Sequence, residues 1–168
     1  VLWTRSDDMK HGYFQAASLH RLSGTIDAQR KVATWTHKKV SSVHNARRKP
    51  SAEQLADAKF FRDSSWGDYD VPYDISSIET SYVQVDTPVP IGPWRAVFSP
   101  SSTFARESFF DELAAAAGKD PIQFRPDHLG GAEKLAAGEL TIDRPRLRRV
   151  LEMLRAKSDW GKRMPAGS

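Results

Sequence analysis

Residues 18–43, SLHRLSGTIDAQRKVATWTHKKVSSV, are the most informative stretch of the 168-residue chain. Two runs rich in β-forming residues, 18–26 and 32–43, flank the polar pentapeptide 27–31. A polar connection of this length between such runs is typical of an antiparallel hairpin. The opening residues 1–5 also have strand character, so residues 1–43 are predicted to form a strand and hairpin region.

Downstream, a further strand and a helix are predicted. Residues 78–85 return to β-forming residues, and the proline-rich stretch 87–93 favours an extended connector. A helix is then expected from Phe104, capped by Ser102 or Thr103 and ended by Gly118. Its apolar face comprises Phe109, Phe110, Leu113, Ala114 and Ala117. Strands followed by helices indicate an α+β fold, an antiparallel sheet packed by two or three helices from the C-terminal half.

Two shorter helices complete the prediction. Asp120 and Pro121 supply a cap and a first-turn proline for a helix that Pro126 is expected to stop. Glycines at 130, 131 and 138 predict a loose linker. Asp143 opens a last helix, in which Leu147, Val150, Leu151 and Leu154 recur at helical spacing.

The chain is expected to be one α+β domain over residues 1–168. Within it, 44–77 is predicted to be a surface excursion, with a short helix over 51–61 and a turn-rich loop over 63–70. Residues 78–125 hold the strand, a candidate pocket segment and the main helix. Residues 139–160 hold the C-terminal helix.

Composition excludes several classes of protein. There is no cysteine, so disulfides, thiolate zinc sites and iron–sulfur clusters ligated by this chain are excluded. Neither an apolar run long enough to cross a membrane nor a basic-then-apolar leader is found. The first residue is Val1 in mid-pattern, which suggests processing or a piece of a longer chain.

The net charge of +4 averages over unlike segments. Residues 1–49 hold ten Lys and Arg against three Asp and Glu, whereas residues 50–92 hold two against eight. The densest basic patch comprises Lys38, Lys39, Arg47, Arg48 and Lys49. It is more simply a solvated strand end, although phosphate contacts remain an alternative. The arginines at 144, 146, 148 and 149 are expected on the solvent face of the last helix.

Short catalytic motifs are absent. The sequence has no P-loop, no dinucleotide-binding glycine motif and no nucleophile elbow. None of the histidines, at 11, 20, 37, 44 and 128, forms a pair with the spacing of a helical metal site, so no metal ligand is predicted. Asp7 and Asp8 are expected to serve a turn or a cap rather than a cation.

One segment is chemically suggestive. Residues 92–98, Gly-Pro-Trp-Arg-Ala-Val-Phe, place Arg95 between bulky apolar residues, just before a helix N-terminus. Helix N-termini attract anionic oxygens, and arginine binds them in a charge-assisted way. A structural role, in which the arginine stem covers apolar surface, is equally compatible with the pattern.

At these residues the chain resembles a known family. Thr87-Pro-Val-Pro-Ile-Gly-Pro-Trp-Arg95, Phe104-Ala-Arg-Glu-Ser-Phe-Phe-Asp-Glu-Leu-Ala114 and Gly118-Lys-Asp-Pro-Ile-Gln-Phe-Arg125 resemble the molybdopterin-binding large subunit of molybdenum hydroxylases. Residues 3–14, 16–22, 24–28 and 71–75 resemble preceding blocks of the same family. The nearest branch is the isoquinoline 1-oxidoreductase beta-subunit type of the xanthine dehydrogenase and aldehyde oxidase superfamily.

The resemblance implies an oxidoreductase that hydroxylates an N-heteroaromatic or aldehyde carbon with oxygen from water. The implied cofactor is molybdopterin cytosine dinucleotide. The implied partners are the remainder of the large subunit, a small [2Fe-2S] subunit and a small-molecule substrate; no membrane span and no nucleic acid are expected. The compartment stays open between cytoplasm and periplasm.

Carried over by position, Trp94, Arg95, Ala96 and Val97 match the family's segment beside molybdenum. Val97 stands where relatives carry phenylalanine, and Gln15 where many carry arginine, which suggests a different pocket. The family's essential glutamate and its glycine- and glutamine-rich cofactor loops have no counterpart. The chain is therefore expected to form part of such an enzyme, with no catalytic residue of its own and no catalysis alone. The alternative is a stand-alone basic binding module.

Overall fold

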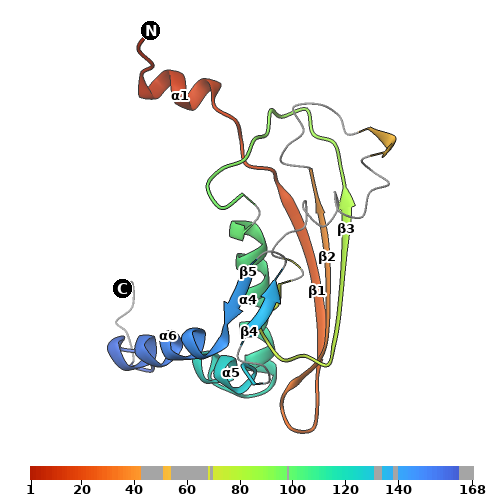
Figure 1. Ribbon diagram of the computed structural model, residues 1–168, viewed down its shortest axis with the longest axis vertical. Helices are drawn as coiled ribbons and strands as arrows, with labels where there is room; N and C mark the ends of the chain where they lie inside the picture. Colours follow the sequence, from red (N-terminus) through yellow and green to blue (C-terminus); the bar gives the residue numbers. More distant parts are fainter. Residues whose placement is uncertain are drawn as a thin grey trace. The chain divides into compact units, whose positions relative to one another are not determined.

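The computed structural model describes residues 1–42, 51–53, 68, 70–97, 99–130, 134–137 and 140–162. The helices are α1 (Arg5–His11), α4 (Ser99–Ala116), α5 (Pro121–Asp127) and α6 (Arg144–Lys157). The strands are β1 (Ser18–Ile26), β2 (Val32–Ser41), β3 (Ser77–Gln84), β4 (Lys134–Ala137) and β5 (Leu140–Asp143) (Figure 1). The predicted α+β class is confirmed.

Backbone contacts divide the chain into two compact units. The first comprises Val1–Ser23, Thr36–Tyr69 and Glu79–Glu107, and the second comprises Gly24–Trp35, Asp70–Ile78 and Ser108–Ser168. Each unit therefore gathers segments that are distant in sequence. The candidate site described below lies within the first unit, and the aromatic core lies within the second.

Strands β1, β2 and β3 form a sheet in that order, as Figure 1 shows. The predicted hairpin of β1 and β2 is confirmed. In its turn the Asp27 carboxylate accepts hydrogen bonds from the backbone N–H groups of Gln29 and Lys31, at 2.9 and 2.8 Å. Arg30 adopts a φ of 58°, so the turn rests on side-chain capping by Asp27 rather than on a glycine.

The core of the second unit is aromatic. Phe110 is fully buried, and its ring stacks on Tyr73 at a centroid distance of 3.9 Å. Phe124 and Trp35 lie 4.9 and 6.5 Å from the same ring. Offset and tilted ring pairs of this kind contribute about 0.5–1.5 kcal/mol each beyond their buried area. The apolar face predicted for the helix at 104–117 therefore supplies the centre of this core.

His128 joins the hairpin to the C-terminal end of α5 within the second unit. Its Nδ1–H donates to the Phe124 carbonyl at 2.7 Å, and its Nε2 accepts the Val32 backbone N–H at 3.0 Å. These two bonds require the neutral imidazole, because protonated Nε2 has no lone pair for Val32. Burial also lowers the pKa of His128 below its usual 6.5.

We expect acid to destabilise the second unit through His128. The unfolded chain binds a proton at the usual pKa of 6.5 and the folded chain binds it only at lower pH. Stability from this group is therefore complete above pH 6.5 and is lost as the pH falls through the lowered pKa. In urea unfolding followed against pH, His128→Gln should flatten the loss below pH 6.5. The exposed His11→Gln is the control, and an equal slope in His128→Gln and the parent chain would contradict the assignment.

A buried arginine holds the start of α6 in the second unit. Arg144 donates from Nε to the Pro72 carbonyl at 3.1 Å and from Nη1 to the Gly130 carbonyl at 2.8 Å. Its Nη2 pairs with Asp74 at 3.3 Å. The prediction that the arginines of this helix all face solvent is thus wrong for Arg144. Two carbonyl oxygens and one carboxylate oxygen take the place of water molecules around its guanidinium group.

Helix caps follow the sequence closely. Asp143 caps α6 through the Arg146 N–H, Asp120 caps α5 through the Gln123 N–H, and Gly118 ends its helix at a φ of 64°. Asp7 completes a capping box with Thr4 at the start of α1, so the expected cap role is confirmed. The strand character expected for residues 1–5 is wrong, because this cap starts a helix at Arg5.

Other boundaries differ from prediction. Helix α4 begins at Ser99, about one turn before the expected start, with Pro100 in the first turn, where no N–H is required. Helix α5 continues past Pro126 to Asp127. The linker expected near residues 130–138 instead contains β4, which pairs antiparallel with the following strand β5, with Lys134 opposite Asp143 and Ala137 opposite Leu140.

Some predictions lie outside the described residues. These are the helix over 51–61 apart from 51–53, nearly all of the loop over 63–70, and the basic residues Arg47, Arg48 and Lys49. The one-domain organisation and its subdivisions stay a prediction. Within the described residues, no helix is long and apolar enough to cross a membrane.

Candidate functional site

The segment singled out by the sequence is anchored on the chain just before β1. Phe14 and Ile91 form a parallel bridge in the first unit. The Phe14 N–H donates to the Pro90 carbonyl at 2.9 Å, and the Gly92 N–H donates to the Phe14 carbonyl at 3.0 Å. The prolines of 87–93 thus hold an extended segment that pairs for one bridge only, as their missing N–H groups dictate.

Close packing fixes the position of Trp94. Its indole Nε1–H donates to the Tyr13 carbonyl at 2.8 Å. A Cβ placed on Gly92 would lie 2.8 Å from the Tyr13 Cβ, so only glycine permits this approach. Residues 13–15 and 92–97, about eighty positions apart, therefore form one substructure.

The backbone of the predicted pocket segment is strained. Ala96 and Val97 adopt φ angles of 67° and 37°, a region that residues with a Cβ rarely occupy. The Val97 N–H donates to the Trp94 carbonyl at 2.9 Å, and the Ser99 N–H donates to the Ala96 carbonyl at 2.8 Å. The turn thus leads directly into α4. Strain of this kind costs of order 1–3 kcal/mol per residue and is concentrated at functional sites.

The structure brings Gln15 to this turn. The Gln15 amide lies 3.5 Å from the Val97 carbonyl oxygen, at the outer limit of a hydrogen bond. Trp94, Arg95 and Ala96 are exposed, and Val97 is half-buried. All five residues predicted for the pocket therefore lie within the substructure of residues 13–15 and 92–97.

Arg95 sits at the tip of the turn. Within the described part of the chain its guanidinium has no hydrogen bond or ion pair, and its side chain faces solvent. An unpaired guanidinium on a rigid turn is a ready partner for an anionic oxygen, because the five N–H donors are fixed in one plane. The arrangement can bind and orient an anion. Among its described side chains there is neither a general base nor a nucleophile.

A second cluster lies in the first unit, and sequence spacing did not reveal it. His20 on β1 and His37 on β2 face each other, with His20 Nδ1 2.8 Å from His37 Nε2. Asp68 lies beside them, its Oδ1 3.9 Å from His37 Nδ1. Burial, opposed by the charge of Asp68, lowers the pKa of His37 to about 4. The neighbours on adjacent strands are seventeen residues apart, so only a correct hairpin register would have found the pair.

Lys39 belongs to the same cluster. Its side chain is fully buried, with Nζ 3.2 Å from Asp68 Oδ2 and 3.1 Å from the Ser102 hydroxyl. The sequence placed Lys39 in an exposed basic patch with Lys38, and that prediction is wrong for Lys39. Successive strand residues point to opposite faces, so Lys38 is exposed and Lys39 turns inward. Lys39 is therefore unavailable to phosphate.

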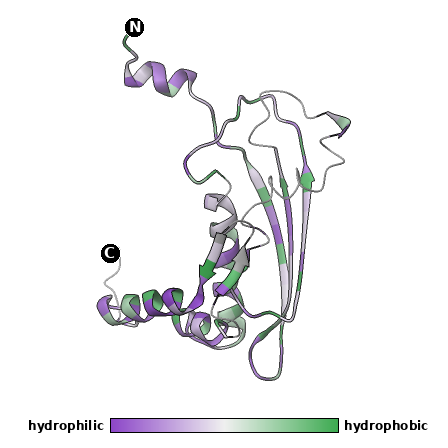
Figure 2. Ribbon diagram, viewed as in Figure 1, coloured by the Kyte–Doolittle hydropathy of each residue, from purple (hydrophilic) through white to green (hydrophobic). Residues whose placement is uncertain are grey.

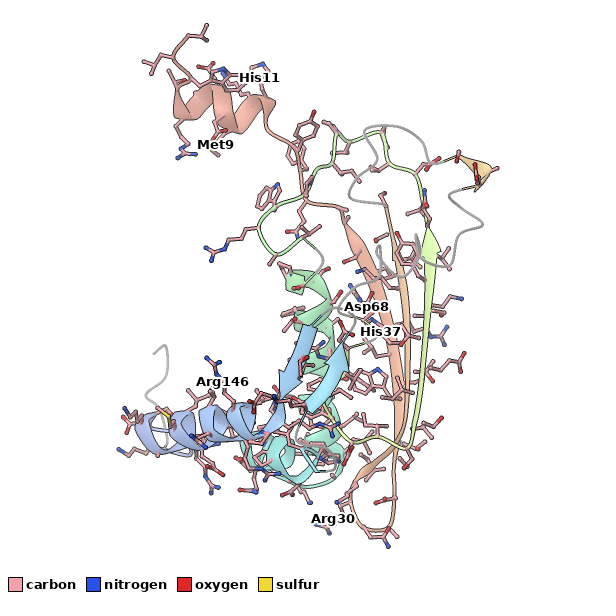
Figure 3. All side chains as sticks on the ribbon, viewed as in Figure 1. Met9, His11, Arg30, His37, Asp68 and Arg146 are labelled. Carbon is pink, nitrogen blue, oxygen red and sulfur yellow. The ribbon has the colours of Figure 1, made fainter. Side chains whose placement is uncertain are left out.

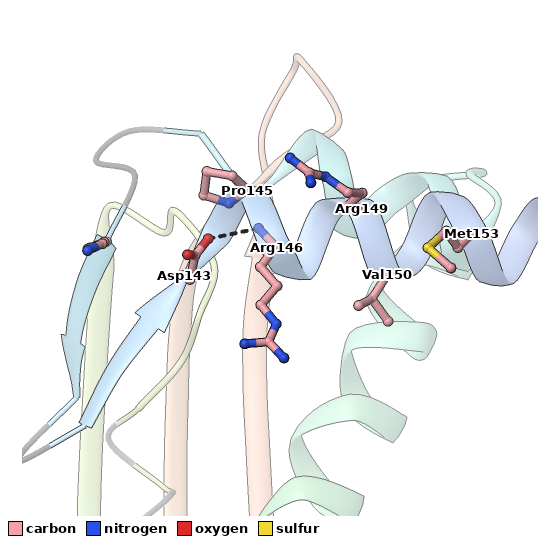
Figure 4. A pocket seen from close by; sticks show the side chains of 7 residues that line it. Asp143, Pro145, Arg146, Arg149, Val150 and Met153 are labelled. Carbon is pink, nitrogen blue, oxygen red and sulfur yellow. Dashed lines mark hydrogen bonds between the residues drawn. The ribbon is translucent and has the colours of Figure 1, made fainter.

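The second unit carries a depression of about 620 Å³ along the start of α6. Arg146 and Arg149 are exposed at its edge, and Asp143 is engaged in capping Arg146 (Figure 4). The apolar Val150 and Met153 line it further along the helix. Figure 2 shows apolar and polar residues alternating along α6, as in an amphipathic helix. The depression therefore lies on the surface of an amphipathic helix.

Comparisons with known proteins find that the chain is similar to parts of larger oxidoreductase subunits. No family model matches. The chain is 26% identical over 167 residues, or 97% of its length, to the beta subunit of isoquinoline 1-oxidoreductase from Brevundimonas diminuta, of which it covers 19%. It is 35% identical over 74 residues, or 44% of its length, to a nicotinate dehydrogenase polypeptide of Pseudomonas putida, of which it covers 6%.

Solved structures agree on the fold. The aldehyde oxidoreductase of Desulfovibrio gigas superimposes with a TM-score of 0.60 at 17% identity, over 85% of this chain and 15% of that one. The chain thus spans about a fifth of the length of its full-coverage curated relative. The resemblance predicted from the motifs is confirmed: the chain is similar over 97% of its length to an isoquinoline 1-oxidoreductase beta subunit, and its fold is similar to that of an aldehyde oxidoreductase.

Proposed function

We propose that this chain is part of the molybdenum-cofactor-binding subunit of an oxidoreductase that hydroxylates an N-heteroaromatic or aldehyde carbon with oxygen from water. Its relatives include isoquinoline 1-oxidoreductase and an aldehyde oxidoreductase, which supports both substrate classes. The observation that carries the proposal is the strained turn at 94–97, whose Val97 carbonyl lies 3.5 Å from the Gln15 amide and whose exposed Arg95 has no partner among the described residues.

The proposed role of the turn is to form one wall of the substrate pocket. Arg95 binds and orients an anionic oxygen of the substrate or of the cofactor. Trp94, held by Tyr13, supplies a flat apolar surface for an aromatic substrate. Val97 is smaller than the phenylalanine that the family resemblance implies at this position, so the pocket accommodates a bulkier or differently placed ring. Gln15 offers a neutral amide at a position where the family resemblance implies an arginine in many relatives. The pocket therefore has no positive charge at this position to select anionic substrates.

The donor set of this turn fits a molybdopterin cofactor as a secondary contact. It offers a guanidinium and no metal ligand, so it suits the oxygen-rich periphery of the cofactor and leaves the metal to other groups. When bound, the cofactor supplies the two-electron oxidation chemistry. We propose the cytosine dinucleotide form, together with the rest of the large subunit and a small [2Fe-2S] subunit as partners. This chain has no cysteine with which to hold such clusters.

The proposed wall is not a complete catalyst. Neither a catalytic base nor a nucleophile accompanies Arg95 among the described residues of the turn, and we expect no turnover from the 168 residues alone. The alternative is a basic nucleic-acid-binding module. It is weakened because Lys39, one of the five residues of its basic patch, is buried and cannot contact phosphate.

Arg95→Ala in the complete subunit, assembled with its partner, tests the proposal. We expect kcat to fall roughly 100-fold, the effect of removing one preorganised donor to developing charge. Molybdenum content should stay near normal, because Arg95 ligates no metal. Arg146→Ala, an equally exposed arginine on α6, is the matched control. Unchanged turnover in Arg95→Ala, or absence of molybdenum from the assembled parent enzyme, would overturn the proposal.

A further inference from the structure

The buried histidine pair of the first unit plays no part in the proposed substrate pocket. His20, His37 and Asp68 each offer one ligand atom within 4.8 Å of the other two. Figure 3 shows His37 and Asp68 next to each other. His37 and Asp68 are each 1% exposed, and neither carboxylate oxygen of Asp68 has a hydrogen bond with a described residue. A buried carboxylate without hydrogen bonds is costly unless other charges satisfy it, and among the described residues Lys39 supplies one, 3.2 Å from Oδ2.

The contact of His20 with Ser18 permits a tautomer whose lone pair points into the cluster. His20 Nε2 lies 2.9 Å from the Ser18 hydroxyl, at the outer side of the ring. When Ser18 accepts the Nε2 proton, Nδ1 carries the lone pair that faces His37. Metal-binding histidines are oriented in this way, by a hydrogen bond from the ring nitrogen that does not bind the metal.

We propose that His20, His37 and Asp68 bind a divalent transition-metal ion of the zinc type. The site would connect β1 and β2 through Asp68. The metal site is separate from the turn at 94–97. It can be tested without assuming the proposed oxidoreductase role.

The donor set suits zinc. Two imidazole nitrogens and a carboxylate oxygen form a common three-residue zinc site, completed by water. Bonds of about 2.0–2.1 Å in a tetrahedron place ligand atoms about 3.3 Å apart. The three candidate ligand atoms now lie within 4.8 Å of one another, and His20 Nδ1 and His37 Nε2 are 2.8 Å apart, so metal binding requires these two nitrogens to separate and the Asp68 oxygen to approach them.

Lys39 is compatible with this site and limits its affinity. The ammonium group lies 3.2 Å from Oδ2, whereas Oδ1 lies 3.9 Å from His37 Nδ1. Asp68 could therefore bind the metal through Oδ1 and keep Lys39 on Oδ2.

Zinc binding to the metal-stripped 168-residue chain tests the site. Calorimetry and metal analysis after gel filtration should give one zinc per chain. X-ray absorption should show nitrogen and oxygen neighbours at about 2.0–2.1 Å with the outer shells of imidazole. His20→Gln and Asp68→Asn should each weaken the affinity at least tenfold, an effect of the order measured even for outer-shell partners, about 10–100-fold.

Two further variants keep the result interpretable. Ser18→Ala, which spares all three ligands, should weaken zinc binding about tenfold if His20 is oriented by Ser18. The exposed His11→Gln should leave both stoichiometry and affinity unchanged. No zinc uptake by the folded parent chain, or uptake that is equal in His20→Gln, would show a hydrogen-bonded histidine pair only and overturn the proposal.

Discussion

Phe110→Ala is expected to lower the free energy of unfolding by about 3–5 kcal/mol, the range for removing a large buried aromatic side chain. The Phe110 ring is 0% exposed and lies at the centre of the aromatic core. Its deletion removes the stacked contact with Tyr73 and the tilted contact with Phe124. The cavity cannot close easily, because Tyr73 and Phe124 come from different segments held by their own backbone contacts.

Urea unfolding followed by tryptophan fluorescence measures this effect, since Trp35 lies 6.5 Å from Phe110. Phe104→Ala on the same helix is the matched control, because Phe104 is 75% exposed and its loss should cost less than about 0.5 kcal/mol. A loss below about 1 kcal/mol for Phe110→Ala would mean that the second unit is not organised around this ring.

Lys39→Met is expected to destabilise the chain by about 3–5 kcal/mol, with a chelator present, because removing one partner of a buried ion pair leaves the other charge uncompensated. Among the described residues, Asp68 would then lose its cation, and the His37 Nδ1 at 3.9 Å would be its remaining charged or polar neighbour in an ion pair. The Ser102 hydroxyl would also lose the ammonium donor that it accepts at 3.1 Å. Urea unfolding of the variant beside the parent chain measures the loss.

The exposed neighbour provides the control. Lys38→Met should change stability by less than about 0.5 kcal/mol, since Lys38 faces solvent. The double variant Lys39→Met with Asp68→Leu should recover most of the loss, because replacing both partners by apolar groups is often neutral or stabilising. A double variant as unstable as Lys39→Met alone would contradict the ion-pair explanation.

Local signals in the sequence predicted the elements that depend on neighbours a few residues away. The Asp27 turn, the caps at Asp120 and Asp143 and the helix end at Gly118 all use contacts within about one turn of chain. Such contacts form in any surroundings, so residue type and spacing are sufficient to predict them.

Boundaries that depend on packing were missed. Helix α4 starts at Ser99 because the strained turn at Ala96 and Val97 leads into it, and nothing local marks that turn. Pro126 is tolerated in the last turn of α5, because its missing N–H removes only the one bond to the Ile122 carbonyl and the helix ends one residue later. The pair β4 and β5 is short, and its glycines resemble those of a linker.

The candidate site divides in the same way. Residue pattern and family resemblance singled out Gln15 and the segment at 94–97, but their approach depends on the backbone bridge between Phe14 and Ile91. The pairing of His20, His37 and Lys39 with Asp68 depends on strand register and on a residue far along the chain. Caps and turns depend on contacts between residues that are close in sequence. The inward orientation of the Lys39 side chain and the contacts of the two histidines depend on which face of the strand is buried. Burial is decided only when the whole chain folds.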